Sequence, residues 1–131
     1  PYVVSGKLIF VAGQITLKDG KIEYTGKVGE DLSVDDGYQA ARLCGLNLLA
    51  QAKAAAGGDL DQIKRVVKLG GFVNSGPDFS NQPEVINGAS DLLHEIYGKK
   101  GDGYHSRSAL GFAALPTGAA VEVEAIFEII R

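Results

Sequence analysis

Apolar positions along this chain follow two periods, one of two residues and one of about 3.6. Residues 7–17 are rich in β-branched and apolar side chains, and a Lys-Asp-Gly turn separates them from a short run at 21–26. This pattern predicts an N-terminal hairpin. Residues 62–75 predict a strand with a bulge or kink at Gly70-Gly71. Residues 107–115 and 119–130 predict two strands joined by Pro-Thr-Gly as a second hairpin.

Helical spacing dominates two other segments. Ser33 followed by Asp36 forms a capping-box-like start, and Gly57-Gly58 is a natural stop, so we expect a first helix between them. A second helix is expected from Pro83 to Gly98, because proline is tolerated in a first helical turn. The apolar stripes of the two helices contain Ala40, Ala41, Cys44, Leu48, Ala52 and Ala55, and Val85, Ala89, Leu92, Leu93 and Ile96.

The resulting order, β-β-α-β-α-β-β, predicts an α+β fold of two layers: a mixed sheet with both helices on one face. The composition does not shift along the 131 residues, so residues 1–131 are expected to form a single domain.

The other face of this sheet is expected to be covered. In the last strand, valine, alanine and phenylalanine alternate with Glu122, Glu124 and Glu128, but the preceding strand has no truly polar face. A sheet with helices on one side usually presents a polar face to water on the other. We therefore expect this small apolar face to be buried against other subunits.

Composition narrows the classes of function. The formal net charge is -3, which disfavours global attraction to nucleic acid or to an acidic membrane. One cysteine, Cys44, cannot form an internal disulfide and fits a reducing compartment, so a cytoplasmic protein is expected. No apolar run is long enough to span a bilayer, and His94, His105 and Cys44 do not have the spacing of a metal site. His94 and Cys44 are interpreted as structural.

Arg107, between two serines at the start of an uncharged strand, is the main candidate for chemistry. Its planar guanidinium suits bidentate capture of a carboxylate or phosphate, and an apolar wall would strengthen that pair. The alternative is a strand-end arginine that reaches solvent. Glu122 and Glu124 either hold a water or form a solvated acidic stripe. His105 shares the Arg107 face and is either a neutral general base or a loop residue without a role.

Several segments together resemble one family. They are GQITLKDGKIEYTGKVGEDL, AARLCGLNLLAQAKAA, RVVKLGGFVNSGPDF, VINGASDLL and RSALGFAALPTGAAVEVEAI, and they cover essentially the whole chain. On these motifs the sequence resembles the RidA/YjgF family, whose members are also labelled L-PSP endoribonucleases and have a chorismate-mutase-like fold. The C-terminal motif, with Arg107 ahead of a Leu-Pro turn and an acidic-apolar strand, is the most specific of them.

The resemblance implies a homotrimer with a central barrel of sheets, helices outside and three clefts between subunits. It also implies cofactor-free hydrolysis of reactive 2-imino (enamine-derived) acids to 2-oxo acids and ammonia. Arg107 then matches the arginine that binds the substrate carboxylate, and Glu122 the glutamate associated with the attacking water. Gly13 matches a glycine whose backbone lines the pocket, and Asn87 a pocket asparagine.

Three positions depart from the family pattern. Ala12 replaces a serine, and Ala109 replaces a frequent cysteine while keeping the backbone carbonyl that would hold the substrate. The pocket tyrosine is either Tyr2 or a residue ahead of Pro1. Two alternative functions therefore stay open: a non-catalytic protein that binds small carboxylates such as 2-oxo acids, and an RNA-cleaving enzyme.

The predicted final hairpin places Arg107 and Glu122 about five positions apart, on the order of 17 Å. They would then reach one ligand only from neighbouring subunits.

Overall fold

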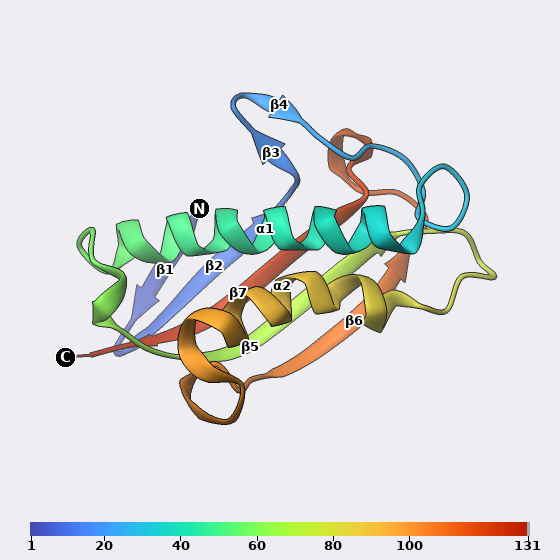
Figure 1. Cartoon of the computed structure of the whole chain (residues 1–131). Helices are drawn as coiled ribbons and strands as arrows, with labels where there is room; N and C mark the ends of the chain where they lie inside the picture. Colours follow the sequence, from blue (N-terminus) through green and yellow to red (C-terminus); the bar gives the residue numbers. More distant parts are fainter. Residues whose placement is uncertain (131) are drawn as a thin grey trace.

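The computed structural model describes residues 1–130, so residue 131 of the predicted domain lies outside the described part. Two helices, α1 (Val34–Ala55) and α2 (Gln82–Tyr97), pack side by side on one face of a five-stranded mixed sheet (Figure 1). The order of strands across the sheet is β1-β2-β7-β5-β6. These strands are β1 (Tyr2–Ser5), β2 (Leu8–Gln14), β5 (Ile63–Asn74), β6 (Ser106–Phe112) and β7 (Val121–Ile129). The two-layer α+β architecture is confirmed.

Both helices begin and end where the sequence predicted. Ser33 caps α1, because its hydroxyl accepts a hydrogen bond from the Asp36 N–H at 3.0 Å while the Asp36 side chain accepts from the Ser33 N–H. After α1 ends, the Gly58 N–H donates back to the Lys53 carbonyl. Gly98, with a φ of 94°, ends α2 in a conformation that favours glycine. A five-residue turn, η2 (Gly98–Asp102), then leads towards β6.

The predicted N-terminal hairpin is wrong in its partners. β2 pairs with β1, which precedes it, in register Tyr2↔Val11. The Lys-Asp-Gly turn joins only two short strands, β3 (Leu17–Lys18) before it and β4 (Lys21–Ile22) after it, which form a two-stranded ribbon outside the main sheet (Figure 1). The run after the turn is short and rich in polar residues, so it has no apolar face to add to the sheet.

The predicted final hairpin is also wrong, because β5 lies between β6 and β7. β5 pairs parallel with β6 and antiparallel with β7, and α2 is the crossover between β5 and β6. The connection through η3 (Pro116–Gly118) passes the end of β5 instead of forming a tight turn. Asn74 holds it there, since its backbone N–H donates to the Ala120 carbonyl at 2.8 Å and its side chain donates to the Ala119 carbonyl.

Gly70 and Gly71 do not mark a bulge. Both pair regularly with β6 and β7, and the register shifts of β5 lie nearer its start, between Ile63 and Arg65 and between Val66 and Lys68. The two glycines are instead required by close packing on both faces of β5. A Cβ at Gly71 would lie 2.6 Å from the Ile86 side chain of α2, and one at Gly70 would lie 2.9 Å from Glu124.

The core lies between the sheet and the helices. Alternate residues of β7, from Val121 to Ile129, face the helices and are buried. On the other face, large apolar side chains remain exposed, among them Phe10, Leu110 and Phe112. This is the face for which the sequence predicts partner subunits, and the trimeric barrel stays a prediction. No helix within residues 1–130 is long and apolar enough to cross a membrane.

Candidate functional site

A cavity of about 420 Å³ opens between α2, η2 and the edge strand β6. Polar side chains from all three elements line it. The lining residues are Asn87, Ser90, Asp91, His94, Lys99, Lys100, Tyr104, His105 and Arg107. Three of them are permanent cations and one is a carboxylate, so the wall favours an anionic ligand.

Arg107 lies on the helix-facing side of β6, opposite Leu69 of β5. One terminal nitrogen, Nη1, donates to the Ser90 hydroxyl at 3.1 Å, and Nη2 donates to the Pro83 carbonyl at 3.3 Å. Partial burial lowers the pKa of the guanidinium, while the nearby charge of Asp91 raises it. Two hydrogen bonds to α2 therefore fix the guanidinium, and its remaining N–H groups are available to a ligand in the cavity.

Ser90 connects Arg107 to His105. The Ser90 hydroxyl lies 2.9 Å from Nε2 of His105, and Nδ1 of His105 lies 2.6 Å from the Gly103 carbonyl. The His105 ring also stacks on His94, with ring centroids 5.2 Å apart. Burial lowers the pKa of His105, so the imidazole is neutral near pH 7.

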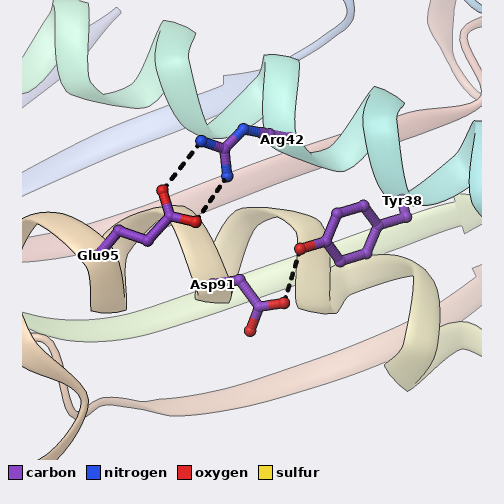
Figure 2. Close-up of polar contacts among 4 residues, drawn as sticks. All are labelled: Tyr38, Arg42, Asp91 and Glu95. Carbon is purple, nitrogen blue, oxygen red and sulfur yellow. Dashed lines mark hydrogen bonds and ion pairs between the residues drawn. The ribbon is translucent and has the colours of Figure 1, made fainter.

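Asp91 lines the cavity, but its carboxylate is hydrogen-bonded to a residue of α1. The Tyr38 hydroxyl of α1 donates to Asp91 at 2.7 Å, and this hydrogen bond raises the pKa of Tyr38. One turn further along, Arg42 pairs with Glu95 at 3.0 Å, with both carboxylate oxygens engaged (Figure 2). These two contacts join α1 to the outer part of α2 and so hold the helix that carries the cavity wall.

Of the residues suggested by the resemblance, Arg107, Asn87 and Ala109 lie in one region. Asn87 lines the same cavity as Arg107. Ala109 lies two residues along β6 on the same face and is partly buried against the core. These three residues occupy the helix side of the sheet edge.

Glu122 and Gly13 lie together on the opposite face of the sheet. A Cβ at Gly13 would overlap the Glu122 carboxylate, so glycine there leaves the room that this side chain occupies. The β2 ladder shifts register between Val11 and Gln14, which places Gly13 in an irregular segment. Burial, with a further contribution from Glu124, raises the pKa of Glu122.

Within one chain, these two groups are separate. Glu122 and Leu110 both align with Phe72, so Arg107 and Glu122 are two strands and three residues apart, or about 14 Å. The predicted hairpin gave a separation of about 17 Å between Arg107 and Glu122. The observed separation is similar, but it arises because β5 lies between the two strands that carry these residues. Tyr2, on β1, lies at the opposite edge of the sheet from β6, roughly 19 Å across.

The sequence interpretation missed Ser90, took His94 as structural, and left His105 open between a neutral general base and a loop residue without a role. The signal was present in the helical spacing, since Asn87, Ser90, Asp91 and His94 recur every three or four residues along α2. Only the pairing of β6 with β5 shows that this polar face of α2 lies against Arg107. Among residues 1–130, no group of three His, Cys, Asp or Glu side chains is arranged to hold a metal ion.

Comparison with known proteins identifies the family. Residues 1–128 match the family model described as "YjgF/chorismate mutase-like, putative endoribonuclease". The chain belongs to the YjgF family. It is 49% identical to Protein TCP17 of Trypanosoma cruzi over 128 aligned residues. The aligned region covers 98% of this chain and 79% of TCP17.

Two solved structures have a similar fold. The protein Atu1372 of Agrobacterium tumefaciens is 49% identical, with a TM-score of 0.95 over 99% of this chain and 80% of Atu1372. RidA of the Antarctic bacterium Psychrobacter is more distant, at 25% identity and a TM-score of 0.65, over 98% of this chain and 85% of RidA. The chorismate-mutase-like fold of the YjgF family is thereby confirmed for this chain.

Proposed function

We propose that this protein is a cofactor-independent hydrolytic deaminase that converts 2-imino acids, and their enamine tautomers, to 2-oxo acids and ammonia. The observation that carries the proposal is the guanidinium of Arg107, fixed at the wall of a cavity of about 420 Å³. A fixed, half-buried guanidinium binds a carboxylate in a defined orientation, and a 2-imino acid carries its reactive carbon next to that carboxylate.

The proposed reaction needs a water that attacks the imine carbon. Its balance is simple: water adds across C=N, the resulting carbinolamine loses ammonia, and a 2-oxo acid remains. Glu122 is suited to accept a proton from this water, since burial raises its pKa towards neutrality and Gly13 leaves room beside its carboxylate. Orientation of the two reactants, with charge complementarity, supplies the acceleration.

Glu122 would have to come from a neighbouring subunit. Arg107 and Glu122 of one chain lie on opposite faces of the sheet and about 14 Å apart. We propose a homotrimer in which the exposed apolar face around Phe10, Leu110 and Phe112 is buried, and in which each cleft combines Arg107 of one chain with Glu122 of the next. Gly13 would join the cleft from the same chain as Glu122, whereas Tyr2, aligned with Val11, lies on the helix-facing side of the sheet, away from Glu122.

The direct test is consumption of an imino acid generated in solution. We expect the protein to accelerate the loss of 2-iminopropanoate, formed from an amino acid by an amino-acid oxidase, and to release pyruvate and ammonia without added cofactor. Parallel measurement by calorimetry records binding of pyruvate itself. Loss of the imine at the uncatalysed rate would contradict the deaminase, whether or not pyruvate binds.

Replacement of Glu122 tests its role in catalysis separately from the binding of the carboxylate. We expect Glu122→Gln to lower kcat by about 100-fold, because an amide cannot accept the proton of the attacking water, and to leave pyruvate affinity within about threefold of wild type. Glu128→Gln, on the same strand and face, serves as the matched control and should keep full activity. Equal losses in both variants would show that the effect does not depend on the position of Glu122 beside the proposed cleft.

A second candidate function rests on Ala12 and Ala109. Alanine at these positions removes two side chains that the family pattern places around the substrate, while the cavity and Arg107 remain. The alternative is a protein that binds small 2-oxo acids without turnover. Saturable pyruvate binding that depends on Arg107, with no acceleration of imine loss, would support the alternative over the deaminase.

A further inference from the structure

Four groups at the cavity wall form one chain of hydrogen bonds. Arg107 Nη1 donates to the Ser90 hydroxyl at 3.1 Å, and the same hydroxyl lies 2.9 Å from Nε2 of His105. The other ring nitrogen, Nδ1, lies 2.6 Å from the Gly103 carbonyl. Ser90 is 4% exposed, so its hydroxyl meets only these partners and the cavity that it lines.

The direction of each bond follows from the chemistry of the partners. A carbonyl oxygen only accepts, so Nδ1 of His105 carries a proton and donates to Gly103. In the neutral imidazole, Nε2 is then the unprotonated nitrogen and accepts the proton of the Ser90 hydroxyl. Arg107 only donates, which leaves the Ser90 oxygen as its acceptor. When His105 is neutral, the Ser90 hydroxyl therefore donates its proton to the imidazole and cannot donate it to a ligand.

Protonation of His105 reverses the middle bond. Nε2 then carries a proton and donates to the Ser90 oxygen, which can accept from both His105 and Arg107 through its two lone pairs. The Ser90 proton is free to turn towards the cavity. An anionic oxygen there can accept from Ser90 and from a free N–H of Arg107 together, because these two donors are only 3.1 Å apart.

We propose that Ser90 and His105 complete the anion site of Arg107: a carboxylate bound by Arg107 accepts the Ser90 hydroxyl proton, and His105 takes up one proton from solvent at Nε2. This inference rests on the proposed capture of a carboxylate by Arg107 and adds two binding residues to it. The ligand class is a small monocarboxylate whose binding is coupled to proton uptake. By linkage, the carboxylate binds more tightly as the pH falls, and it makes His105 more basic by the same factor.

The charges around His105 agree with a rise in its pKa when a carboxylate binds. Burial is the main cause that lowers the pKa of His105; the hydrogen bond to Gly103 raises it, and the charges of His94 and Arg107 lower it further. A bound carboxylate offsets the positive charge of Arg107, so it favours the imidazolium of His105. The titratable and charged groups that share the cavity with His105 are His94 and Asp91 from α2, Lys99 and Lys100 from η2, Tyr104 beside it, and Arg107 from β6.

The test uses the whole protein and pyruvate, which stays ionised across the range studied. NMR titration of the two histidines, with and without saturating pyruvate, measures the pKa of each ring. We expect pyruvate to raise the pKa of His105, and its affinity, measured by calorimetry, to rise about threefold or more from about pH 8 to about pH 6. Calorimetry in buffers of different ionisation enthalpy should show proton uptake on binding.

Two variants separate the parts of this coupling. His105→Gln removes the imidazole that takes up the proton, so the affinity for pyruvate should no longer rise between about pH 8 and about pH 6. This variant also assigns the His105 resonance, which disappears from the spectrum. Ser90→Ala removes the shared hydroxyl, and the rise in affinity at low pH should shrink to less than about half.

The outcomes distinguish this inference from the proposed function. Pyruvate that binds through Arg107 with a pH-independent affinity and an unmoved His105 pKa would overturn the inference and leave the proposed function standing. A shift at His94 in place of His105 would also overturn it. No pyruvate binding at any pH would overturn the capture by Arg107, and the inference with it.

Discussion

Replacement of Arg107 by alanine should weaken pyruvate binding by at least about 100-fold and lower kcat/KM for imine loss by a similar factor. The guanidinium is the one cation in the cavity that two hydrogen bonds to α2 hold in place, at the Ser90 hydroxyl and the Pro83 carbonyl. Lys99 and Lys100 also line the cavity, but both are exposed and belong to the turn after α2. Their charges attract an anion without fixing its orientation.

Two further variants make this prediction specific. Arg107→Lys keeps the positive charge and loses the planar arrangement of donors, so we expect an intermediate loss of about tenfold in affinity. Lys64→Ala removes one charge from an exposed position of β5 outside the cavity and should bind pyruvate like wild type. Calorimetry measures all three affinities. Equal binding by Arg107→Ala and wild type would contradict both the deaminase and the alternative binding function.

The order of secondary structure could be predicted because it depends on local signals. The Ser33 capping box, the glycines after α1 and the glycine that ends α2 each act within a few residues of their own position. The apolar stripes of the helices and the alternation in β7 then indicated which faces are buried. These signals sufficed for the α+β class and for the helix boundaries.

Strand pairing could not be predicted in the same way, because it depends on contacts between distant segments. β6 and β7 are neighbours in sequence, and a short Pro-Thr-Gly connection favours a hairpin. The structure instead inserts β5 between them, since β5 and β6 are joined through α2 as a parallel crossover. The paired glycines of β5 gave a misleading bulge signal for the same reason. The side chains that require them, Ile86 of α2 beside Gly71 and Glu124 of β7 beside Gly70, come from distant segments.

The candidate site was predictable in part. Arg107 stood out because a lone cation heads an uncharged strand, and the family resemblance added Asn87 beside it. Ser90, and its contact with the candidate His105, needed the structure, because the two residues meet only where the middle of α2 lies against the residue ahead of β6. The separation of Glu122 from Arg107 within one chain likewise follows from the sheet order.

Gly88 should be the least tolerant position of the helix layer. A Cβ added there would overlap the backbone carbonyl oxygen of Tyr38 and lie 3.0 Å from the backbone nitrogen of Arg42. Backbone atoms inside a helix cannot move aside individually, so α1 and α2 would have to separate. We expect Gly88→Ala to lower the free energy of unfolding by about 3 kcal/mol or more, against a gain of about 1 kcal/mol from helix propensity.

Gly45→Ala is the matched control for this prediction. Gly45 also faces the other helix, but an added Cβ would meet only the end of the Leu92 side chain at 3.0 Å and Ala89 at 3.4 Å and beyond. A flexible side-chain end can yield, so Gly45→Ala should stay within about 1 kcal/mol of wild type. Denaturant unfolding measures both variants. Similar stabilities for the two would show that the helices are not held at the distance the structure describes.

The same substitution also tests how the helix layer supports the cavity. Gly88 sits between Asn87 and Ser90, and the Tyr38–Asp91 hydrogen bond clamps the next turn of α2 to α1 (Figure 2). If α2 moves outward in Gly88→Ala, the Ser90 hydroxyl moves away from Arg107 and His105. Pyruvate affinity should then fall at temperatures where the variant is still folded, whereas Gly45→Ala should bind normally. Unchanged affinity in a folded Gly88→Ala protein would mean that β6 alone positions Arg107.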